Sequence, residues 1–510
     1  MSDRVTENSA HFIDPAGSNR DAMRSLGYRF VDLLVDVASN ALARPAFDRD
    51  TAPEPGPYHP SEEGRSVAEL MNELGPILST SLNPAHPGYM GHMDTLASAV
   101  GIFSDALVSA ANNNMLSWEM SPVFTAMERQ MTSWFTGLFG WERSETFPGG
   151  GEVPHDEAVP FGQLVSGGTL ANMTAMLVAR NALGGDTKQD GLARLDAPPV
   201  FLATKNAHFS FAKAANLLGL GKEGWVGLPT DDHGAVRIDS IGPVLEKVRR
   251  EGRRPFALVG VAGTTVTGTI DPLPELAEIA EREGLWFHVD AALGGAIAVS
   301  ERLRSRLSGV ERARSITFNP QKWLFVPKTC ASILFRDGRD VDTHLREAFV
   351  YGTSHRREHG EHYNLGEWTL QGTRRVDVLK LYLTLEHIGR RRLARIIERH
   401  LDLASYLAEQ IEAHDELELL TKPDLNIVNF RYRGPSPWDD CEKVAMRCDR
   451  ITASIQRSVE DSGLGWLSLP EYRGRRYLRA VILHPDTDER RLDAILDEVV
   501  RAGREALRTV

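Results

Sequence analysis

The sequence predicts an α/β protein with a large, mostly parallel sheet, an N-terminal helical arm and a small C-terminal α+β domain. The chain has 510 residues, about three to four times the length of a typical domain. Apolar residues make up 42% and charged residues 25%, the composition of a chain that buries a core. Between residues 105 and 388, short apolar runs alternate with amphipathic helical runs, which is typical of βαβ units.

Charge and cysteine content exclude several classes of function. The 58 Lys and Arg residues against 70 Asp and Glu give a net charge of −12, which disfavours nucleic acid or an anionic membrane as the partner. Three scattered cysteines cannot form a disulfide framework or a zinc cluster. The N-terminus has no signal-peptide pattern, and no apolar run approaches the ~20 residues that span a bilayer. We therefore expect a soluble cytoplasmic protein.

The first predicted unit, residues 1–104, is a helical arm. Residues 28–42 have helical periodicity, and a proline-rich stretch follows at residues 44–60. Such an arm has little core of its own. It either caps its own subunit or wraps a partner subunit, and the sequence leaves both arrangements open.

The second predicted unit, residues 105–388, is the large α/β domain, and one stretch illustrates its logic. Residues 255–261 form an apolar strand. Asp271 is a candidate N-cap, Pro272 suits the first helical position and Gly284 suits the end of that helix. The next strand, 285–289, delivers Asp290 at its carboxyl end, where open α/β sheets bind ligands.

The third predicted unit, residues 389–510, is a smaller α+β domain. Helical patterns flank a strand at residues 477–483. A final helix is predicted near residues 488–502.

A candidate phosphate site lies at residues 166–169, with the sequence SGGT. This segment follows an apolar strand and opens a helix. Backbone N–H groups at such a helix start, with Gly168 close to the guest and the hydroxyl of Thr169, form a cradle for an anion. The alternative is an ordinary glycine turn with threonine as the cap.

Three further segments carry candidate chemistry. His208 lies at a strand end, although a lone histidine is more often structural. Asp290 ends an apolar strand and needs a cationic or hydrogen-bonded partner if it is buried. Lys322 lies between apolar runs, where desolvation lowers the pKa of the amine and favours its nucleophilic neutral form. The ordinary alternative for Lys322 is a surface lysine with a buried stem.

Together these segments offer a phosphate cradle, an imidazole that can stack on a ring, a carboxylate for a protonated ring nitrogen and a lysine that can form a Schiff base. These are the groups that pyridoxal 5'-phosphate (PLP) requires of a protein. Each lies at the end of a predicted strand, and this order is far more specific than any single member.

The chain resembles the PLP-dependent group II amino acid decarboxylases, which include the aromatic amino acid, histidine and glutamate decarboxylases. The resemblance runs from about residue 20 to the C-terminus. It implies the fold type I of PLP-dependent transferases, and decarboxylation of an L-amino acid to the amine and CO₂. The motifs that carry it, in family order, are HPGY at residues 86–89, SP at 121–122, SGGT at 166–169, AHFS at 207–210, HVDAA at 288–292 and NPQKW at 319–323.

The resemblance also implies roles for individual residues. Lys322 forms the aldimine with the cofactor, Asp290 pairs with the ring nitrogen, and His208 stacks on one face of the ring. Gln321 stands where many members have histidine, and an amide donates a hydrogen bond but does not titrate. The remaining cofactor-binding positions are Ala292 on the other ring face, Gly168, Thr169 and Asn319 at the phosphate, and Thr264 or Thr265 beside the ring.

Residues 337–367 resemble the mobile loop that closes over the site in this family. Counting from the lysine, Tyr351 falls at the family's catalytic tyrosine, which protonates Cα after CO₂ is lost. The alternative is an ordinary loop aromatic. His355, His359 and His362 share this polar loop, and we expect them to be solvated, with no metal site.

The substrate and the assembly are predicted more coarsely. The HPGYM segment makes His86, Tyr89 and Met90 candidate substrate-binding residues, and its apolar wall favours an aromatic or other apolar amino acid. The resemblance implies a homodimer with active sites near the interface. The alternative functions are an aminotransferase with Arg479 on the α-carboxylate, an oxidative aldehyde synthase, and a PLP-binding pseudoenzyme that serves as a scaffold.

Overall fold

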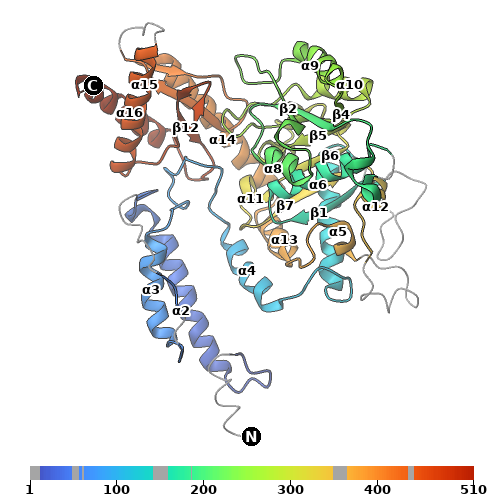
Figure 1. Ribbon diagram of the computed structural model, residues 1–510. Helices are drawn as coiled ribbons and strands as arrows, with labels where there is room; N and C mark the ends of the chain where they lie inside the picture. Colours follow the sequence, from blue (N-terminus) through green and yellow to red (C-terminus); the bar gives the residue numbers. More distant parts are fainter. Residues whose placement is uncertain are drawn as a thin grey trace.

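A computed structural model describes residues 12–48, 57–59, 62–141, 159–184, 187–348, 364–434 and 442–509. Its centre is a seven-stranded sheet in the order β1-β7-β6-β5-β4-β2-β3 (Figure 1). Strand β7 is antiparallel to both its neighbours, and the pairs from β6 to β3 are parallel. The mostly parallel α/β sheet that the sequence predicts is therefore confirmed. The strands are β1 (Phe161–Val165), β2 (Pro199–Thr204), β3 (Trp225–Leu228), β4 (Arg254–Val261), β5 (Trp286–Asp290), β6 (Ser315–Phe318) and β7 (Ala331–Phe335).

Helices cover both faces of this sheet, because its central strands are apolar on both sides. One face packs against α6 (Gly168–Asn181) and α8 (Ser210–Leu217). The other packs against α9 (Ile238–Arg250) and α10 (Leu273–Glu283). Helix α10 ends at Gly284, whose φ of 66° is the left-handed conformation that favours glycine.

The predicted N-cap of α10 is wrong. Pro272 occupies the N-cap position and the helix begins at Leu273. The carboxylate of Asp271 instead accepts hydrogen bonds of 2.9 Å from the backbone N–H groups of Val236 and Val261. Asp271 therefore ties β4 to the segment before α9.

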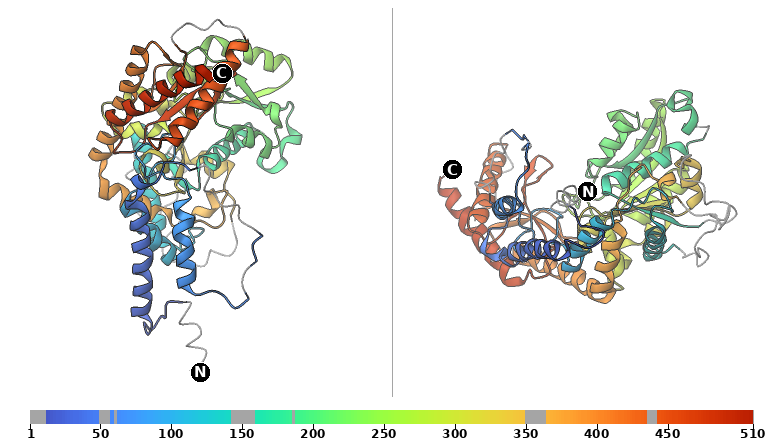
Figure 2. Two further views of the ribbon diagram at one scale, coloured as in Figure 1. Left: turned by 90° about the vertical axis from the view of Figure 1, so that its left-hand side faces the viewer. Right: turned by 90° about the horizontal axis from the view of Figure 1, so that it is seen from below.

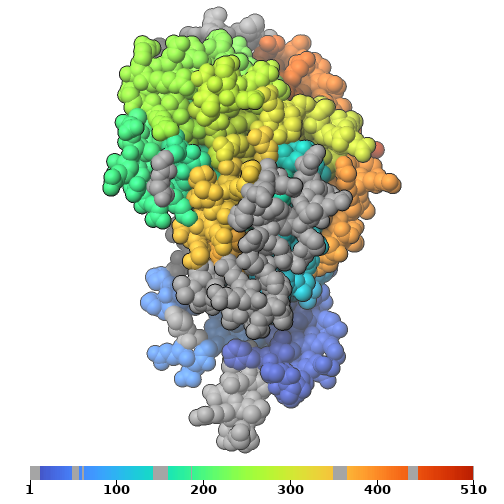
Figure 3. Space-filling model, turned by 90° about the vertical axis from the view of Figure 1, so that its right-hand side faces the viewer, coloured from blue at the N-terminus to red at the C-terminus, as the bar shows by residue number. Residues whose placement is uncertain are grey.

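The N-terminal arm contains α2 (Arg20–Ser39) and α3 (Val67–Ser79), which lie side by side and extend away from the body of the molecule (Figures 1 and 2). From the α/β side, the arm lies at one end of the molecule (Figure 3). Neither helix contains a buried residue. Helix α4 (Ala99–Ala111) crosses the predicted boundary at residue 104 and packs against α13 (Asp377–Ile388).

The C-terminal region forms its own core around a three-stranded antiparallel sheet of β8 (Leu417–Leu419), β9 (Ile427–Tyr432) and β12 (Leu478–Val481). The predicted strand and final helix both exist there, although that helix continues beyond residue 502. The helices of this region are α14 (Arg390–Ala413), α15 (Glu442–Asp461) and α16 (Glu489–Thr509).

The segment predicted as a mobile loop has regular structure near both ends. Helix α12 (Gly338–His344) packs on the sheet through buried Val341, and a 3₁₀ turn spans Leu365–Trp368. Tyr351, His355, His359 and His362 lie outside the described residues. In the described part of the chain, no helix combines the length and apolarity needed to cross a bilayer.

Candidate active site

The carboxyl ends of β4, β5 and β6 meet at one edge of the sheet, and Asp290 lies there. It pairs in register with Val261 of β4 and Thr317 of β6. Its side chain is 5% exposed. The carboxylate accepts a hydrogen bond of 2.8 Å from Nδ2 of Asn172 and one of 3.1 Å from the backbone N–H of Ala292. Within the described ranges no ion pair joins Asp290 to a lysine or arginine, so this buried anion suits a cationic ligand atom.

Lys322 approaches the same edge from α11 (Pro320–Trp323), the short helix that follows β6. Its Nζ lies 3.4 Å from Sδ of Met93. Burial lowers the pKa of the Lys322 amine, while the carboxylates of Asp290 and Asp94 act in the opposite direction. The predicted lysine and aspartate therefore share one site, with the lysine shifted toward its nucleophilic form.

His208 follows β2 and completes the predicted trio. Its Nδ1 accepts a hydrogen bond of 3.2 Å from the backbone N–H of Ser210 at the start of α8. Burial lowers the pKa of His208, and the charges of Asp290 and Lys322 also act on it. A neutral imidazole beside these two groups can stack on a planar ring.

The start of α6 forms the predicted anion cradle together with Asn319. A Cβ atom at Gly168 would lie 2.7 Å from Nδ2 of Asn319, so only glycine leaves this space open. Asn319 is 4% exposed, and its Oδ1 has no hydrogen-bond partner among the described residues. The Nδ2 of Asn319 lies beside the N-terminus of α6, so it can donate a hydrogen bond to a phosphate group held by the helix N–H groups.

Two predicted cofactor contacts have other tasks in the structure. The hydroxyl of Thr264 lies 2.6 Å from the Thr267 hydroxyl and accepts a hydrogen bond of 3.1 Å from the backbone N–H of Thr269, which closes the turn after β4. The Oε1 atom of Gln321 accepts a hydrogen bond of 2.5 Å from the backbone N–H of Cys330. Gln321 therefore fastens α11 to the start of β7 and keeps only its amide NH₂ for a ligand.

Arg479 also lies at this site, although the sequence pointed to it only under the aminotransferase alternative. Its guanidinium donates hydrogen bonds of 2.6 Å to the carbonyl of Thr265 and 3.0 Å to that of Gly91. Burial lowers its pKa to about 10, so it stays charged at neutral pH. No acidic side chain of the described residues forms an ion pair with it. Arg479 lowers the pKa of Lys322, so its charge reaches the reacting amine.

The segment predicted to bind the substrate, residues 86–90, is buried against other parts of the protein and does not form an open apolar wall. Tyr89 is 3% exposed and stacks on Trp466 with ring centroids 5.5 Å apart. Met90 packs in the C-terminal core. Nδ1 of His86 accepts a hydrogen bond of 3.0 Å from the backbone N–H of Gly88, and burial lowers the pKa of His86 to about 4. These contacts are structural, and a role of the three residues in binding substrate stays a prediction.

Sequence reasoning missed Asn172 and His288. Asn172 lies four residues after Gly168 on α6, and this spacing places both residues on one helix face. His288 lies two residues before Asp290 on β5, and side chains two apart in a strand share a face. Both periodicities were available in the sequence and would have identified these neighbours.

One protein family matches most of the chain. The model described as "Pyridoxal-dependent decarboxylase conserved domain" matches residues 54–433. The chain belongs to this family. It is a PLP-dependent amino acid decarboxylase, a carboxy-lyase, and the fold and cofactor expected from the sequence are confirmed.

Relatives cover nearly the whole chain. L-2,4-diaminobutyrate decarboxylase of Rhizobium meliloti is 31% identical over 517 residues, which cover 98% of this chain and 96% of that protein. Aspartate 1-decarboxylase of Aliivibrio fischeri is 30% identical, covering 89% and 85% of the two chains. The crystal structure of mouse CSAD has a TM-score of 0.83 and 25% identity, covering 95% of this chain and 99% of that one.

Proposed function

We propose that this enzyme decarboxylates an amino acid with a short, charged side chain, through Lys322 and Asp290. One observation carries the proposed reaction: the amine of Lys322 meets the buried carboxylate of Asp290, which forms no ion pair among the described residues, beyond the carboxyl ends of β5 and β6. Bound PLP supplies the electron sink for the charge that remains when CO₂ leaves. Lys322 holds the cofactor through its aldehyde carbon, and Asp290 keeps a proton on the ring nitrogen.

The remaining cofactor contacts are proposed from the family resemblance, together with the positions of His208, Gly168 and Asn319. His208 would lie on one face of the cofactor ring, and Ala292 would lie on the other. Gly168, Thr169 and Asn319 hold the phosphate, with the free NH₂ of Gln321 as a further donor. The clearance between Gly168 and Asn319 supports this assignment.

Tyr351 is the proposed acid that returns a proton to Cα. Its support is the family resemblance of the segment after Lys322, and a positioned acid contributes about 10²- to 10⁴-fold to the rate. Replacement of Tyr351 by phenylalanine should therefore keep the visible absorption band of bound PLP and lose amine formation. Lys322→Ala should lose that band.

Arg479 is the proposed partner of the substrate α-carboxylate. Among the described residues this buried guanidinium binds two carbonyls, a hydroxyl and the His92 imidazole but no carboxylate, so its charge stays available for an anion. This contact would select α-amino acids over their amine products.

The side-chain preference is proposed from the charges beside Lys322. Asp94 acts on the pKa of Lys322 and forms an ion pair with Lys328, and both partners are partly exposed. A substrate with a short cationic side chain would take the place of Lys328 at Asp94, as 2,4-diaminobutyrate can. The R. meliloti relative, named for that substrate, supports this choice.

Acidic amino acids are the second candidate, because Lys328 could pair with a substrate carboxylate and the A. fischeri relative is an aspartate decarboxylase. The aromatic preference expected from the sequence has weaker support. Met90 lies in the C-terminal core, and Tyr89 is stacked on Trp466.

A decarboxylation screen tests these assignments. Purified holoenzyme is given 2,4-diaminobutyrate, aspartate, glutamate, tyrosine and tryptophan, and CO₂ and amines are quantified. We expect the highest turnover with 2,4-diaminobutyrate, and we expect Asp94→Asn to lower it more than Lys328→Gln. The reverse order of the two variants, with aspartate as the best substrate, would favour the acidic candidate. A keto acid or an aldehyde in place of the amine would overturn the proposed reaction.

The proposed assembly is a homodimer in which the arm packs on a partner chain. Its support is the apolar surface that α2 leaves exposed, including Tyr28, Phe30, Val31 and Val35. Light scattering should give twice the 56.4 kDa of one chain. The double substitution Phe30→Asp and Val35→Asp should weaken the dimer, and a monomeric wild-type protein would contradict this assembly.

A further inference from the structure

A continuous chain of buried side chains runs behind Asp290, from the opposite end of β5 to the active site. Trp286 begins it, Ser315 and His288 continue it, and Asn172 ends it at the carboxylate. Ser315 and His288 are fully buried and Asn172 is 1% exposed. Each neighbouring pair lies within hydrogen-bond distance.

The hydrogen positions in this chain follow from the groups at its two ends. The carboxylate of Asp290 can only accept, so the Asn172 amide turns its Nδ2 toward it at 2.8 Å. The Asn172 Oδ1 then faces Nε2 of His288 at 3.2 Å. Because an amide oxygen can only accept, Nε2 of His288 must carry a hydrogen.

The other end of the chain agrees with this assignment. Burial lowers the pKa of His288 to about 4, so the ring is neutral and its Nδ1 is an acceptor. The indole N–H of Trp286 donates a hydrogen bond of 2.8 Å to Oγ of Ser315, which leaves the Ser315 hydroxyl hydrogen to bond Nδ1 at 2.9 Å. The Ser315 carbonyl oxygen, 3.1 Å from Nδ1, is then a neighbour without a hydrogen between them.

Asn172 also reaches the histidine expected on the ring face. Its second Nδ2 hydrogen points to Oγ of Ser210 at 3.0 Å. The backbone N–H of Ser210 donates a hydrogen bond to Nδ1 of His208. A single amide therefore braces both Asp290 and the segment that carries His208.

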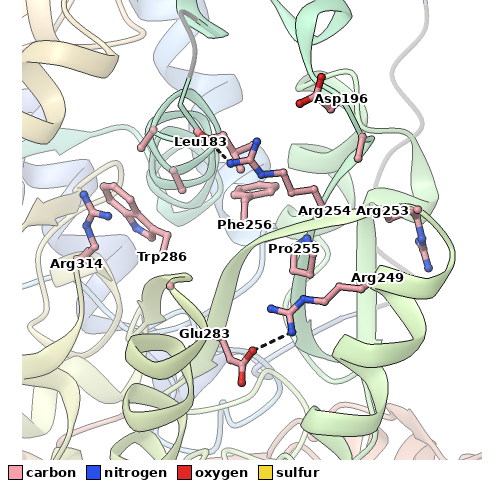
Figure 4. A pocket seen from close by; sticks show the side chains of 15 residues that line it. Leu183, Asp196, Arg249, Arg253, Arg254, Pro255, Phe256, Glu283, Trp286 and Arg314 are labelled. Carbon is pink, nitrogen blue, oxygen red and sulfur yellow. Dashed lines mark hydrogen bonds and ion pairs between the residues drawn. The ribbon is translucent and has the colours of Figure 1, made fainter.

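The chain begins at a pocket beside the amino ends of β4 and β5, whereas Asp290 lies at the carboxyl end of β5 (Figure 4). Trp286 lines this pocket, which has a volume of about 620 Å³. The guanidinium of Arg314 lies over the indole ring at 3.9 Å and holds it in place. Every polar atom from this indole to Asp290 thus has a fixed partner.

We propose that Asn172 and His288 are positioning residues, which hold Asp290 in the orientation that binds the protonated ring nitrogen of PLP. This inference rests on the proposed role of Asp290. A neutral amide stabilises the charged carboxylate by a hydrogen bond and adds no charge that would compete with the ring nitrogen. Its loss should weaken PLP binding and change the pH at which the ring nitrogen loses its proton.

The test compares Asn172→Ala with Thr174→Ala, a control on the same helix whose buried hydroxyl bonds the Leu170 carbonyl. Two readouts are taken: the PLP dissociation constant, and the pH midpoint of the visible band of the bound cofactor. We expect Asn172→Ala to weaken PLP binding about 10-fold and to shift the pH midpoint downward. Thr174→Ala should leave both unchanged.

His288 provides a second pair of variants. Glutamine at this position can still donate to Asn172 and accept from Ser315, whereas leucine can do neither. We therefore expect His288→Leu to reproduce the effect of Asn172→Ala, and His288→Gln to stay near the wild-type protein. Ser315→Ala is the mildest of these changes and should shift the pH midpoint in the same direction. It provides the test if the larger substitutions prevent folding.

Three outcomes separate this inference from the proposed function. If Asp290→Asn leaves PLP affinity and the pH midpoint unchanged, the proposed role of Asp290 is wrong. If Asp290→Asn changes both while Asn172→Ala matches Thr174→Ala, only the positioning role is wrong. Equal effects of leucine and glutamine at position 288 would likewise reject the hydrogen-bond chain.

Discussion

The indole of Trp323 donates a hydrogen bond of 2.9 Å to Nδ1 of His400, and the two ring planes are inclined by only 15° with their centroids 6.2 Å apart. Trp323 directly follows Lys322, and His400 belongs to α14. The Nε2 atom of His400 in turn lies 3.2 Å from the carbonyl oxygen of His484. The backbone that carries the reactive lysine is therefore fastened to the C-terminal region through one imidazole.

This contact predicts that the protein loses stability in acid through His400. Burial lowers the pKa of His400 from 6.5 to about 3. Between these values the unfolded chain binds a proton that the folded chain does not, so the contribution is complete above pH 6.5 and is lost as the pH falls. A single group of this kind costs at most about 1.4 kcal/mol per pH unit.

Thermal unfolding at pH 7.5 and pH 5 measures the effect. We expect His400→Gln to have a lower Tm than the wild-type protein at pH 7.5, and a smaller drop in Tm between the two pH values. Other buried histidines, including His86 and His288, are present in both proteins and cancel in the comparison. An unchanged drop in the variant would show that His400 does not cause it.

The buried ion pair between Glu128 and Arg374 predicts a large loss of stability when one partner is removed. Both side chains are at most 5% exposed. Glu128 accepts a hydrogen bond of 2.9 Å from the Leu164 N–H, and Arg374 donates one of 2.8 Å to the Leu164 carbonyl, so the pair holds β1. Arg374→Met leaves a buried charge and should cost about 3–5 kcal/mol.

Exposed pairs provide the control for that measurement. Arg501 and Glu505 lie on the surface of α16, and Arg501→Ala should lower the free energy of unfolding far less than Arg374→Met does. The double variant Glu128→Gln with Arg374→Met should recover part of the loss, because no charge remains unpaired. Equal losses in the single and double variants, measured by denaturant unfolding, would contradict this explanation.

Much of the active site could be predicted because its functional residues lie at the ends of strands. A strand can be recognised from a short run of neighbouring residues in the sequence. The apolar run before Asp290 and the helix stop at Gly284 need only nearby residues. The interpretation of Asp271 failed because its partners, Val236 and Val261, come from other elements. A local capping pattern cannot compete with such tertiary hydrogen bonds.

Long-range contacts account for the rest. Met90 looks like a pocket residue in sequence, yet it packs in a core made mainly of residues beyond 400. The next residue, Gly91, must be glycine, because a Cβ atom there would lie 1.9 Å from the ring of Trp466. Arg479 reaches the active site from β12, some 150 residues after Lys322 in the sequence. Periodicity and spacing carry no information about such pairs.

Substitution of Gly168 should weaken PLP binding without lowering the stability of the apo protein. Gly168→Ala places a methyl group 2.7 Å from Nδ2 of Asn319, within the proposed phosphate site. Overpacking of this kind should weaken PLP binding about 10-fold or more, while the Tm of the apo protein changes little. Gly167→Ala is the matched control, because a Cβ there meets no atom within 4 Å. Equal PLP dissociation constants for the two variants would remove Gly168 from the phosphate site.

Substitution of Arg479 should lower kcat/KM for the substrate and leave the affinity for PLP unchanged. If its guanidinium binds the α-carboxylate, Arg479→Gln should lower kcat/KM about 100-fold, the usual cost of removing one partner of a buried charge pair. The PLP dissociation constant should stay within about twofold of wild type, since the described contacts of Arg479 are to Ser468, Gly91, His92 and Thr265.

Lysine at the same position separates charge from geometry. Arg479→Lys keeps the positive charge but cannot bind the Gly91 and Thr265 carbonyls and a carboxylate at once in the planar arrangement of a guanidinium. We expect it to recover only a small part of the lost kcat/KM. Steady-state kinetics with the best substrate, and with its amine product as an inhibitor, give the deciding comparison. Since the amine has no α-carboxylate, its inhibition constant should be equal in all three proteins, and a parallel loss of amine binding would assign Arg479 to the shape of the site.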